Sequence, residues 1–104
     1  MSKFDEREKS FEKRFAQDQE LQFKVSAKRN KYLAEWAGSK LGKNDEQRQN
    51  YVQEVIKADL EEAGEEDVFR KVKKDFENSA INMDDSEIRN QMSLALERAK
   101  KDFE

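Results

Sequence analysis

The spacing of apolar residues over the first third of the chain constrains the fold most. Between residues 4 and 36 these side chains fall on a seven-residue repeat with alternating steps of three and four, and the whole chain contains no proline. Such steps place side chains along one side of an α-helix. The row consists of Phe4, Phe11, Phe15, Val25, Tyr32 and Trp36. The spacing predicts one long helix over about residues 2–41, which Gly38 and Gly42 would end.

The apolar row is uneven, and this divides the predicted helix into two parts. Before residue 20 it holds little besides Phe4, Phe11 and Phe15 in a charged setting. After residue 20 a second row joins it, made of Phe23, Ala27, Ala34, Ala37 and Leu41. A helix with two apolar rows can be buried in a bundle, whereas a thin row of three phenylalanines cannot. We therefore predict an N-terminal segment, residues 1–19, that is flexible in the free protein, and a bundle domain, residues 20–104.

Three further helical patterns follow. Asn44 with Gln47 three residues later has the spacing of a capping box, and the helix that it starts would end at Gly64. Acidic residues 65–67 suit the first turn of a third helix that gives out near Asn78. Asp84 with Glu87 resembles another start, for a last helix reaching Phe103. The apolar faces of these three helices are Tyr51, Val52, Val55, Ile56, Leu60 and Ala63; Val68, Phe69, Val72 and Phe76; and Ile88, Met92, Ala95, Leu96, Ala99 and Phe103.

These patterns together predict an all-α fold. No segment shows the strict apolar–polar alternation of a half-buried strand. Four helices joined by short connections favour a four-helix bundle whose long N-terminal helix is partly exposed or frayed. We expect three-quarters or more of the residues to be helical, with Tyr32, Leu33 and Trp36 in the core, where the two apolar rows meet.

Composition excludes several classes of function. The chain has neither cysteine nor histidine, which removes disulfides, the usual zinc sites and nucleophilic mechanisms that need an imidazole base. Nothing indicates a pocket that would shift a carboxylate pKa, so we predict no catalytic residue and no enzyme. The acidic run over residues 61–67 lacks the pattern of a calcium loop, and we interpret it as a solvated helix end rather than a metal site.

The charge distribution and hydropathy bear on partners. The net charge is −3, but residues 1–31 carry nine Lys/Arg against six Asp/Glu. So mild an excess argues against nucleic acid and suggests that the N-terminal segment meets an acidic or mixed surface. No apolar run approaches the roughly 20 residues of a membrane span, and the first ten residues do not resemble a secretory signal. We therefore expect a cytoplasmic protein without direct membrane insertion.

Two clusters of basic residues are candidates for binding an anionic ligand. One lies at residues 28–31 and the other at residues 70–74. Neither belongs to a glycine-rich phosphate loop, and basic clusters on helices are usually solvated faces. If a nucleotide binds, its phosphates need several donors, and the candidates are Arg29, Lys31, Arg70 and Lys74.

The N-terminal phenylalanines allow two interpretations. They could pack back on the bundle, or they could form the apolar face of a helix that binds in a partner's groove. We favour the partner, because an exposed apolar stripe on a soluble chain tends to be a binding site. The candidate partner-binding residues are Phe4, Arg7, Glu8, Phe11, Lys13, Arg14 and Phe15.

Five motifs along the chain are specific enough to be compared with known families. They are Phe4-x-x-Arg7-Glu8-x-x-Phe11-Glu12-x-x-Phe15-Ala16-x-Asp18, Phe23-Lys24, Arg29-Asn30-Lys31-x-Leu33-x-x-Trp36-Ala37, Leu41-Gly42-Lys43 and Ala58-Asp59-x-Glu61-Glu62-Ala63-Gly64-x-Glu66-Asp67-Val68-Phe69-Arg70-Lys71-Val72. Together they closely resemble the ζ-subunit (ATPase inhibitor subunit zeta) of α-proteobacterial F-type ATP synthases. Small departures from the family pattern include Lys28, where arginine is common, and Ala34, where glycine is common.

The resemblance implies an inhibitor of ATP hydrolysis by the rotary enzyme. Its N-terminal helix, about residues 2–19, would enter a catalytic-subunit interface in the head formed by the alpha, beta and gamma subunits and stop rotation. The chain would then be peripheral to the inner membrane through the ATP synthase. The resemblance also implies ADP or ATP as a regulatory ligand, with no cofactor required. The alternative function is a small helical adenine-nucleotide sensor without an inhibitory N-terminal segment.

Overall fold

The computed structural model describes residues 3–61 and 65–104, except the side chains of residues 3–8. It is 83% helical, which confirms the all-α prediction for this part of the chain. The prediction of four helices is wrong, because the described residues form five. They are α1 (Lys3–Gln17), α2 (Gln19–Lys40), α3 (Asp45–Asp59), α4 (Glu66–Asn78) and α5 (Asp85–Asp102).

The predicted long N-terminal helix is broken at Asp18. This residue has extended backbone angles, φ −102° and ψ 104°, and its carboxylate accepts a hydrogen bond from the Leu21 amide at 3.1 Å. Asp18 is therefore the N-cap of α2. The side-chain amide of Gln22 donates to the Phe15 carbonyl at 2.7 Å and so satisfies one of the open carbonyls at the end of α1. The hydrogen bond from the Leu21 amide to the short side chain of Asp18 is therefore favoured over continuation of one helix through residue 18.

The other helix ends follow local chemistry. Asn44 and Gln47 form the predicted capping box, with both hydrogen bonds at 2.9 Å. Gly42, at φ 75°, ends α2 in a Schellman motif, in which Lys43 N–H donates to the Gly38 carbonyl at 3.0 Å. Gly38 thus lies inside α2 and does not mark its end as predicted. Helix α3 ends at Asp59, earlier than predicted, and the expected stop at Gly64 lies outside the described residues.

The end of α4 repeats this motif with a less suitable residue. Ile81 N–H donates to the Phe76 carbonyl at 2.9 Å and Ala80 N–H donates to the Glu77 carbonyl at 3.0 Å. The left-handed position is taken by Ala80, at φ 58°, where glycine is usual. Helix α5 begins after Asp84 as predicted, although the Asp84 side chain forms no capping hydrogen bond.

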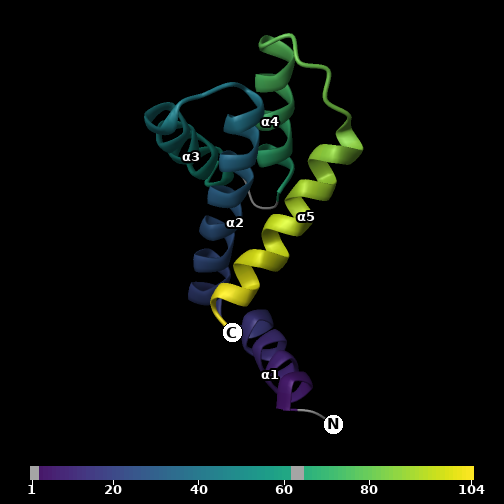
Figure 1. The fold of residues 1–104 in the computed structure, drawn as a ribbon. Helices are drawn as coiled ribbons and strands as arrows, with labels where there is room; N and C mark the ends of the chain where they lie inside the picture. Colours follow the sequence, from purple (N-terminus) through teal and green to yellow (C-terminus); the bar gives the residue numbers. More distant parts are fainter. Residues whose placement is uncertain (1–2, 62–64) are drawn as a thin grey trace.

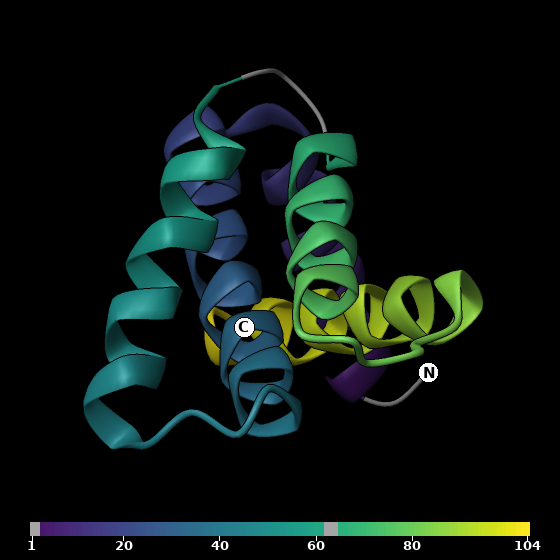
Figure 2. The same cartoon turned by 90° about the horizontal axis from the view of Figure 1, so that it is seen from above.

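Helix α2 is the central element of the molecule, and it contacts each of the other four helices. Figure 2 shows α5 crossing the bundle instead of running alongside its neighbours. Figure 1 shows α1 extending away from the other helices, beyond the end of α5. The molecule is accordingly elongated, with principal dimensions of 49 × 26 × 25 Å.

Helices α2 to α5 share one hydrophobic core, which we call the main core. Leu33 is buried there as predicted, whereas Tyr32 and Trp36 are only partly buried at its edge. Trp36 packs edge-on against Phe76 with ring centroids 5.6 Å apart. Phe23, predicted to be buried, is 59% exposed. The buried members of the main core are Leu33, Ala34, Ala37, Tyr51, Val55, Val68, Phe69, Val72, Phe76, Ile88, Met92 and Ala95.

No helix in the described ranges combines the length and the hydropathy that crossing a membrane requires.

Candidate functional site

The phenylalanine face of α1 is partly covered by the end of α5. Phe11 is only 5% exposed, which makes the predicted solvent exposure of the stripe wrong at this residue. The Phe15 ring stacks on that of Phe11, with centroids 6.1 Å apart and planes inclined by 18°. We call this group the α1 cluster; its buried members are Phe11, Leu21, Val25 and Ala99, and Phe15, Tyr32, Leu96 and Phe103 pack against them.

Charged groups frame the same contact. The Lys100 ammonium lies 3.5 Å from the Glu12 carboxylate and 4.9 Å from the centre of the Phe15 ring. The Arg14 guanidinium lies 5.9 Å from the centre of the Phe11 ring, while its side chain and that of Lys13 are exposed. One side of α1 is therefore packed on the bundle, and another presents cations to solvent.

Three of the predicted partner-binding residues, Phe4, Arg7 and Glu8, belong to α1. Their side chains lie outside the described residues. The partner-binding role of the whole set stays a prediction.

Of the predicted nucleotide-binding residues, Arg29 lies inside a buried polar network. Its guanidinium donates to Asn30 Oδ1 at 3.0 and 3.1 Å, to Asp59 Oδ1 at 3.1 Å and to Glu65 Oε2 at 3.4 Å. The Asn30 amide donates to Asp59 Oδ2 at 3.0 Å. Arg29 is 6% exposed and Asn30 is 1% exposed. The network joins α2 to the end of α3 and the start of α4, and it engages most of the Arg29 donors that a phosphate would need.

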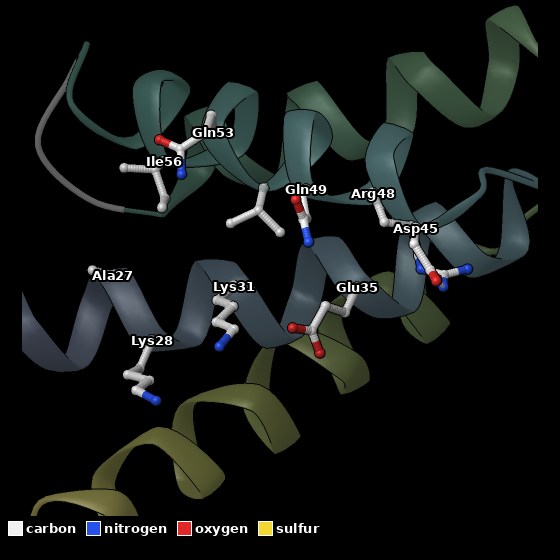
Figure 3. Close-up of a pocket in the computed structure, with 10 residues that line it drawn as sticks. Ala27, Lys28, Lys31, Glu35, Asp45, Arg48, Gln49, Gln53 and Ile56 are labelled. Carbon is white, nitrogen blue, oxygen red and sulfur yellow. Dashed lines mark hydrogen bonds and ion pairs between the residues drawn. The ribbon is translucent and has the colours of Figure 1, made fainter.

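Lys31 lies instead in an open hollow between α2 and α3, of about 920 Å³. Figure 3 shows Lys28, Lys31 and Glu35 following one another along α2, with Gln53 and Gln49 of α3 across from them and Arg48 and Asp45 further along, beyond Glu35. The apolar residues Ala27, Val52 and Ile56 complete its lining. The hollow thus combines cations with an apolar wall.

Arg70 and Lys74 line a second hollow, between α3 and α4, of about 460 Å³. Arg70 forms an ion pair with Asp67. Lys71 in the same hollow pairs with Glu54 at 3.1 Å and Asp75 at 3.0 Å. Burial alone lowers the pKa of Lys71, but its hydrogen bonds to these two carboxylates outweigh burial and raise it. Carboxylates therefore already neutralise part of this hollow.

The four predicted nucleotide-binding residues are thus divided among three places in the fold. Arg29 is in the buried network, Lys31 is in the first hollow, and Arg70 and Lys74 are in the second. Within the described ranges, no group of three or more acidic side chains is placed to hold a metal ion.

Sequence reasoning missed two groups of residues around these sites. Arg48, which lines the first hollow together with Lys31, could be placed only by knowing how α3 packs on α2. Lys100 and Ala99 form the surface that receives α1, and the helical spacing of Ala95, Ala99 and Phe103 was the available signal. That spacing identifies an apolar face but not the helix that covers it.

Comparison with known proteins identifies the family. None of the curated proteins matches the chain. Residues 1–102 match the protein family described as ATPase inhibitor subunit zeta. Since this match spans nearly the whole sequence, from α1 to the end of α5, the chain belongs to the ATPase inhibitor subunit zeta family.

Proposed function

We propose that the chain inhibits ATP hydrolysis by the rotary F-type ATP synthase and that α1 is its inhibitory element. In this proposal α1 inserts into a catalytic-subunit interface of the head formed by the alpha, beta and gamma subunits. The family match over residues 1–102 carries the inhibitory role. The chain itself performs no chemistry, and it lies on the cytoplasmic side of the inner membrane through its attachment to the enzyme.

The placement of α1 supports its choice as the inserted element. It extends beyond the other helices (Figure 1), and within the described part of the chain its backbone approaches only α2. An inserted helix opposes rotation by filling a groove that must otherwise close. Apolar anchors such as Phe11 and Phe15 would then supply affinity, and the exposed Lys13 and Arg14 would orient the helix.

Truncation tests this proposal directly. A chain that lacks residues 1–17 keeps Asp18, which caps α2, so the remaining helices retain their local starts. We expect the truncated chain to lose inhibition of ATP hydrolysis by the membrane-extracted ATP synthase, while far-ultraviolet circular dichroism shows that it remains helical. A truncated chain that still inhibits would move the function onto the bundle.

A charge reversal separates the surface of α1 from its packing. Lys13→Glu changes an exposed cation of α1, and Lys101→Glu changes an exposed cation at the end of α5. If α1 enters the enzyme, Lys13→Glu should weaken inhibition by about two- to fivefold, the size of a typical exposed charge contact. Lys101→Glu should inhibit like the parent chain.

We also propose a regulatory adenine nucleotide in the hollow between α2 and α3. The observation that favours this hollow is the combination of the cations Lys28, Lys31 and Arg48, of which Lys28 pairs with Asp102 and Arg48 with Asp45, with the apolar side chains of Val52 and Ile56. Phosphates pair with such cations, and an adenine ring can cover such an apolar wall. The same hollow would be the ligand site if the chain has the alternative function, that of a small helical adenine-nucleotide sensor.

Titration with ATP, followed by backbone amide chemical shifts, tests this site. Lys31→Gln should weaken binding by about tenfold, as expected for losing a charge-assisted phosphate contact. Lys74→Gln, in the hollow between α3 and α4, is the matched variant. If Lys74→Gln alone weakens binding, the nucleotide binds between α3 and α4.

A further inference from the structure

We propose that the α1 cluster is a self-masking clasp: in the free chain the end of α5 occupies the phenylalanine face of α1, and α1 must leave α5 before it can insert into its target. This inference rests on the proposed inhibitory function and adds a regulatory step to it. The two groups that oppose each other are Phe11 and Phe15 on α1 and Ala99 and Lys100 on α5.

The clasp follows from the burial of the proposed anchor. Phe11 is 5% exposed because it packs against Leu21, Val25 and Ala99. An apolar side chain supplies binding energy when it moves from water into a partner's pocket. Phe11 has already left water in the free chain, so it cannot anchor a partner without first giving up its contacts with the end of α5 and the start of α2.

The α5 side of the clasp is attached to α2 by helix packing, because the two backbones approach each other and Ala99 is buried in the same cluster as Val25. The Tyr32 hydroxyl donates a hydrogen bond to Asp102, and this bond is the largest contribution to a raised Tyr32 pKa. The Arg98 guanidinium lies over the same ring, 3.9 Å from its centroid. Lys28 adds an ion pair with Asp102 at 4.0 Å. The end of α5 therefore stays with α2 when α1 departs.

The α1 side is attached more weakly. At every described Cα pair the backbones of α1 and α5 stay more than 8 Å apart, so the two helices meet only through side chains. The ion pair that joins them involves a Glu12 side chain that is 52% exposed, and such pairs contribute little. Elements with few buried contacts open at low free-energy cost.

Asp18 lets α1 open without disturbing α2. Its carboxylate caps the Leu21 amide, so α2 keeps its own start whatever α1 does. The single extended residue between the helices can therefore serve as the hinge. If only the open form binds, the apparent affinity for the enzyme is reduced by the fraction of chains that are open.

A cross-link between the two sides of the clasp tests the inference. The chain has no native cysteine, so a Glu12→Cys/Lys100→Cys variant carries two unique thiols. Because the backbones are too far apart for a disulfide, a short bis-maleimide is the suitable bridge. We expect the bridged chain to lose inhibition of ATP hydrolysis by about tenfold or more, since the open fraction falls towards zero. The same variant with each thiol blocked by N-ethylmaleimide should still inhibit.

The matched control bridges two helices of the bundle. Lys73 of α4 and Asp85 of α5 form a comparable ion pair, at 3.2 Å. A bridged Lys73→Cys/Asp85→Cys chain should inhibit like the parent. If the Glu12–Lys100 bridge also leaves inhibition unchanged, α1 acts without leaving α5 and the inference is overturned. If the unmodified parent chain does not inhibit, the proposed function fails instead.

A second measurement, hydrogen exchange, tests in the absence of the enzyme whether α5 holds α1. Lys100→Glu removes the cation over Phe15 and places a like charge beside Glu12, and Lys101→Glu is the control at the neighbouring exposed position. Hydrogen exchange of the α1 amides should be about two- to fivefold faster in Lys100→Glu than in Lys101→Glu. Equal exchange in the two variants would show that α1 is not held by α5 and would overturn the inference.

Discussion

The main core and the α1 cluster are built from the same helical spacing, yet they hold the chain together to different degrees. The main core takes aromatic and branched side chains from four helices, and Tyr51, Val55 and Phe76 are at most 1% exposed there. The α1 cluster depends on one buried α1 side chain, Phe11. Two apolar rows fix a helix in a bundle, whereas one row makes a contact that can be undone. Stability therefore resides in the main core, and the proposed function resides in the α1 cluster.

Truncating one aromatic side chain in each region is the strongest test of the difference in stability between the main core and the α1 cluster. Phe76→Ala should destabilise the fold by about 3–5 kcal/mol, as buried phenylalanine truncations do. Phe11→Ala should cost about 1–2 kcal/mol at most, because a docked helix cannot contribute more than its own docking free energy. Chemical denaturation of both variants gives the two numbers. Equal losses would make α1 an integral part of the bundle.

The buried polar network is the next test of the main domain. Asp59→Ala removes the carboxylate that lies 3.1 Å from the buried Arg29 guanidinium and leaves the partly exposed Glu65 as its charged partner, and the expected loss of stability is about 3 kcal/mol. Asp59→Asn keeps an acceptor oxygen and should cost less. Lys73→Ala breaks an exposed ion pair and should cost about 1 kcal/mol or less, measured by the same denaturation.

Alkaline pH should weaken the main domain through Tyr51. Burial first, and then a 2.8 Å hydrogen bond to Asp75, raise the pKa of this phenol above its ordinary value of about 10. The neutral phenol is the form that the fold favours, so its stabilisation is complete below pH 10 and is lost as the pH rises beyond that value. The raised pKa of Lys71 acts in the same direction.

Tyr51→Phe isolates the phenol contribution. At pH 7 it should cost about 1 kcal/mol for the lost hydrogen bond. Between about pH 9.5 and 11 its melting temperature should fall less steeply than that of the parent. Parallel slopes for the two chains would mean that Tyr51 does not titrate with folding.

The smallest expected effect is a gain in the free energy of unfolding from a substitution at Ala80, just after the end of α4. Ala80 adopts φ 58°, which costs an L-residue about 1–2 kcal/mol and costs glycine nothing. Ala80→Gly should therefore stabilise the main domain by about 0.5–1 kcal/mol, after allowance for the greater freedom of glycine when unfolded. The melting temperature measures this gain. Hydrogen exchange in α1 should not change, which would confirm that the two regions are separate.

Local chemistry made much of the fold predictable from the sequence. The capping box at Asn44, the end of α4 at Asn78 and the apolar face around Phe76 follow from residues within one or two helical turns. The break at Asp18 was harder to predict, because the same residue can continue a helix or cap the next one. The hydrogen bond from Gln22 to the end of α1 exists only once the chain has turned there.

The candidate site was less predictable, because it depends on contacts between distant segments. The break at Asp18 accompanies the burial of Leu21 in place of Phe23, although both are apolar. The sequence alone makes Arg29 a candidate phosphate donor, because its partners Asp59, at the end of α3, and Glu65, just before α4, are distant in sequence. Nothing near Phe11 in the sequence indicates that Ala99 will cover it.

The position of the single tryptophan separates the two regions spectroscopically. Trp36 packs at the edge of the main core against Phe76 and takes no part in the α1 cluster. Its fluorescence emission should therefore change when the bundle unfolds cooperatively. The emission should stay unchanged when only α1 separates from α5. A dye attached at position 12 would respond to the departure of α1, whether by hinge opening or by global unfolding. A change in the dye signal without a change in tryptophan emission would therefore identify hinge opening, and both signals can be recorded in the same cuvette.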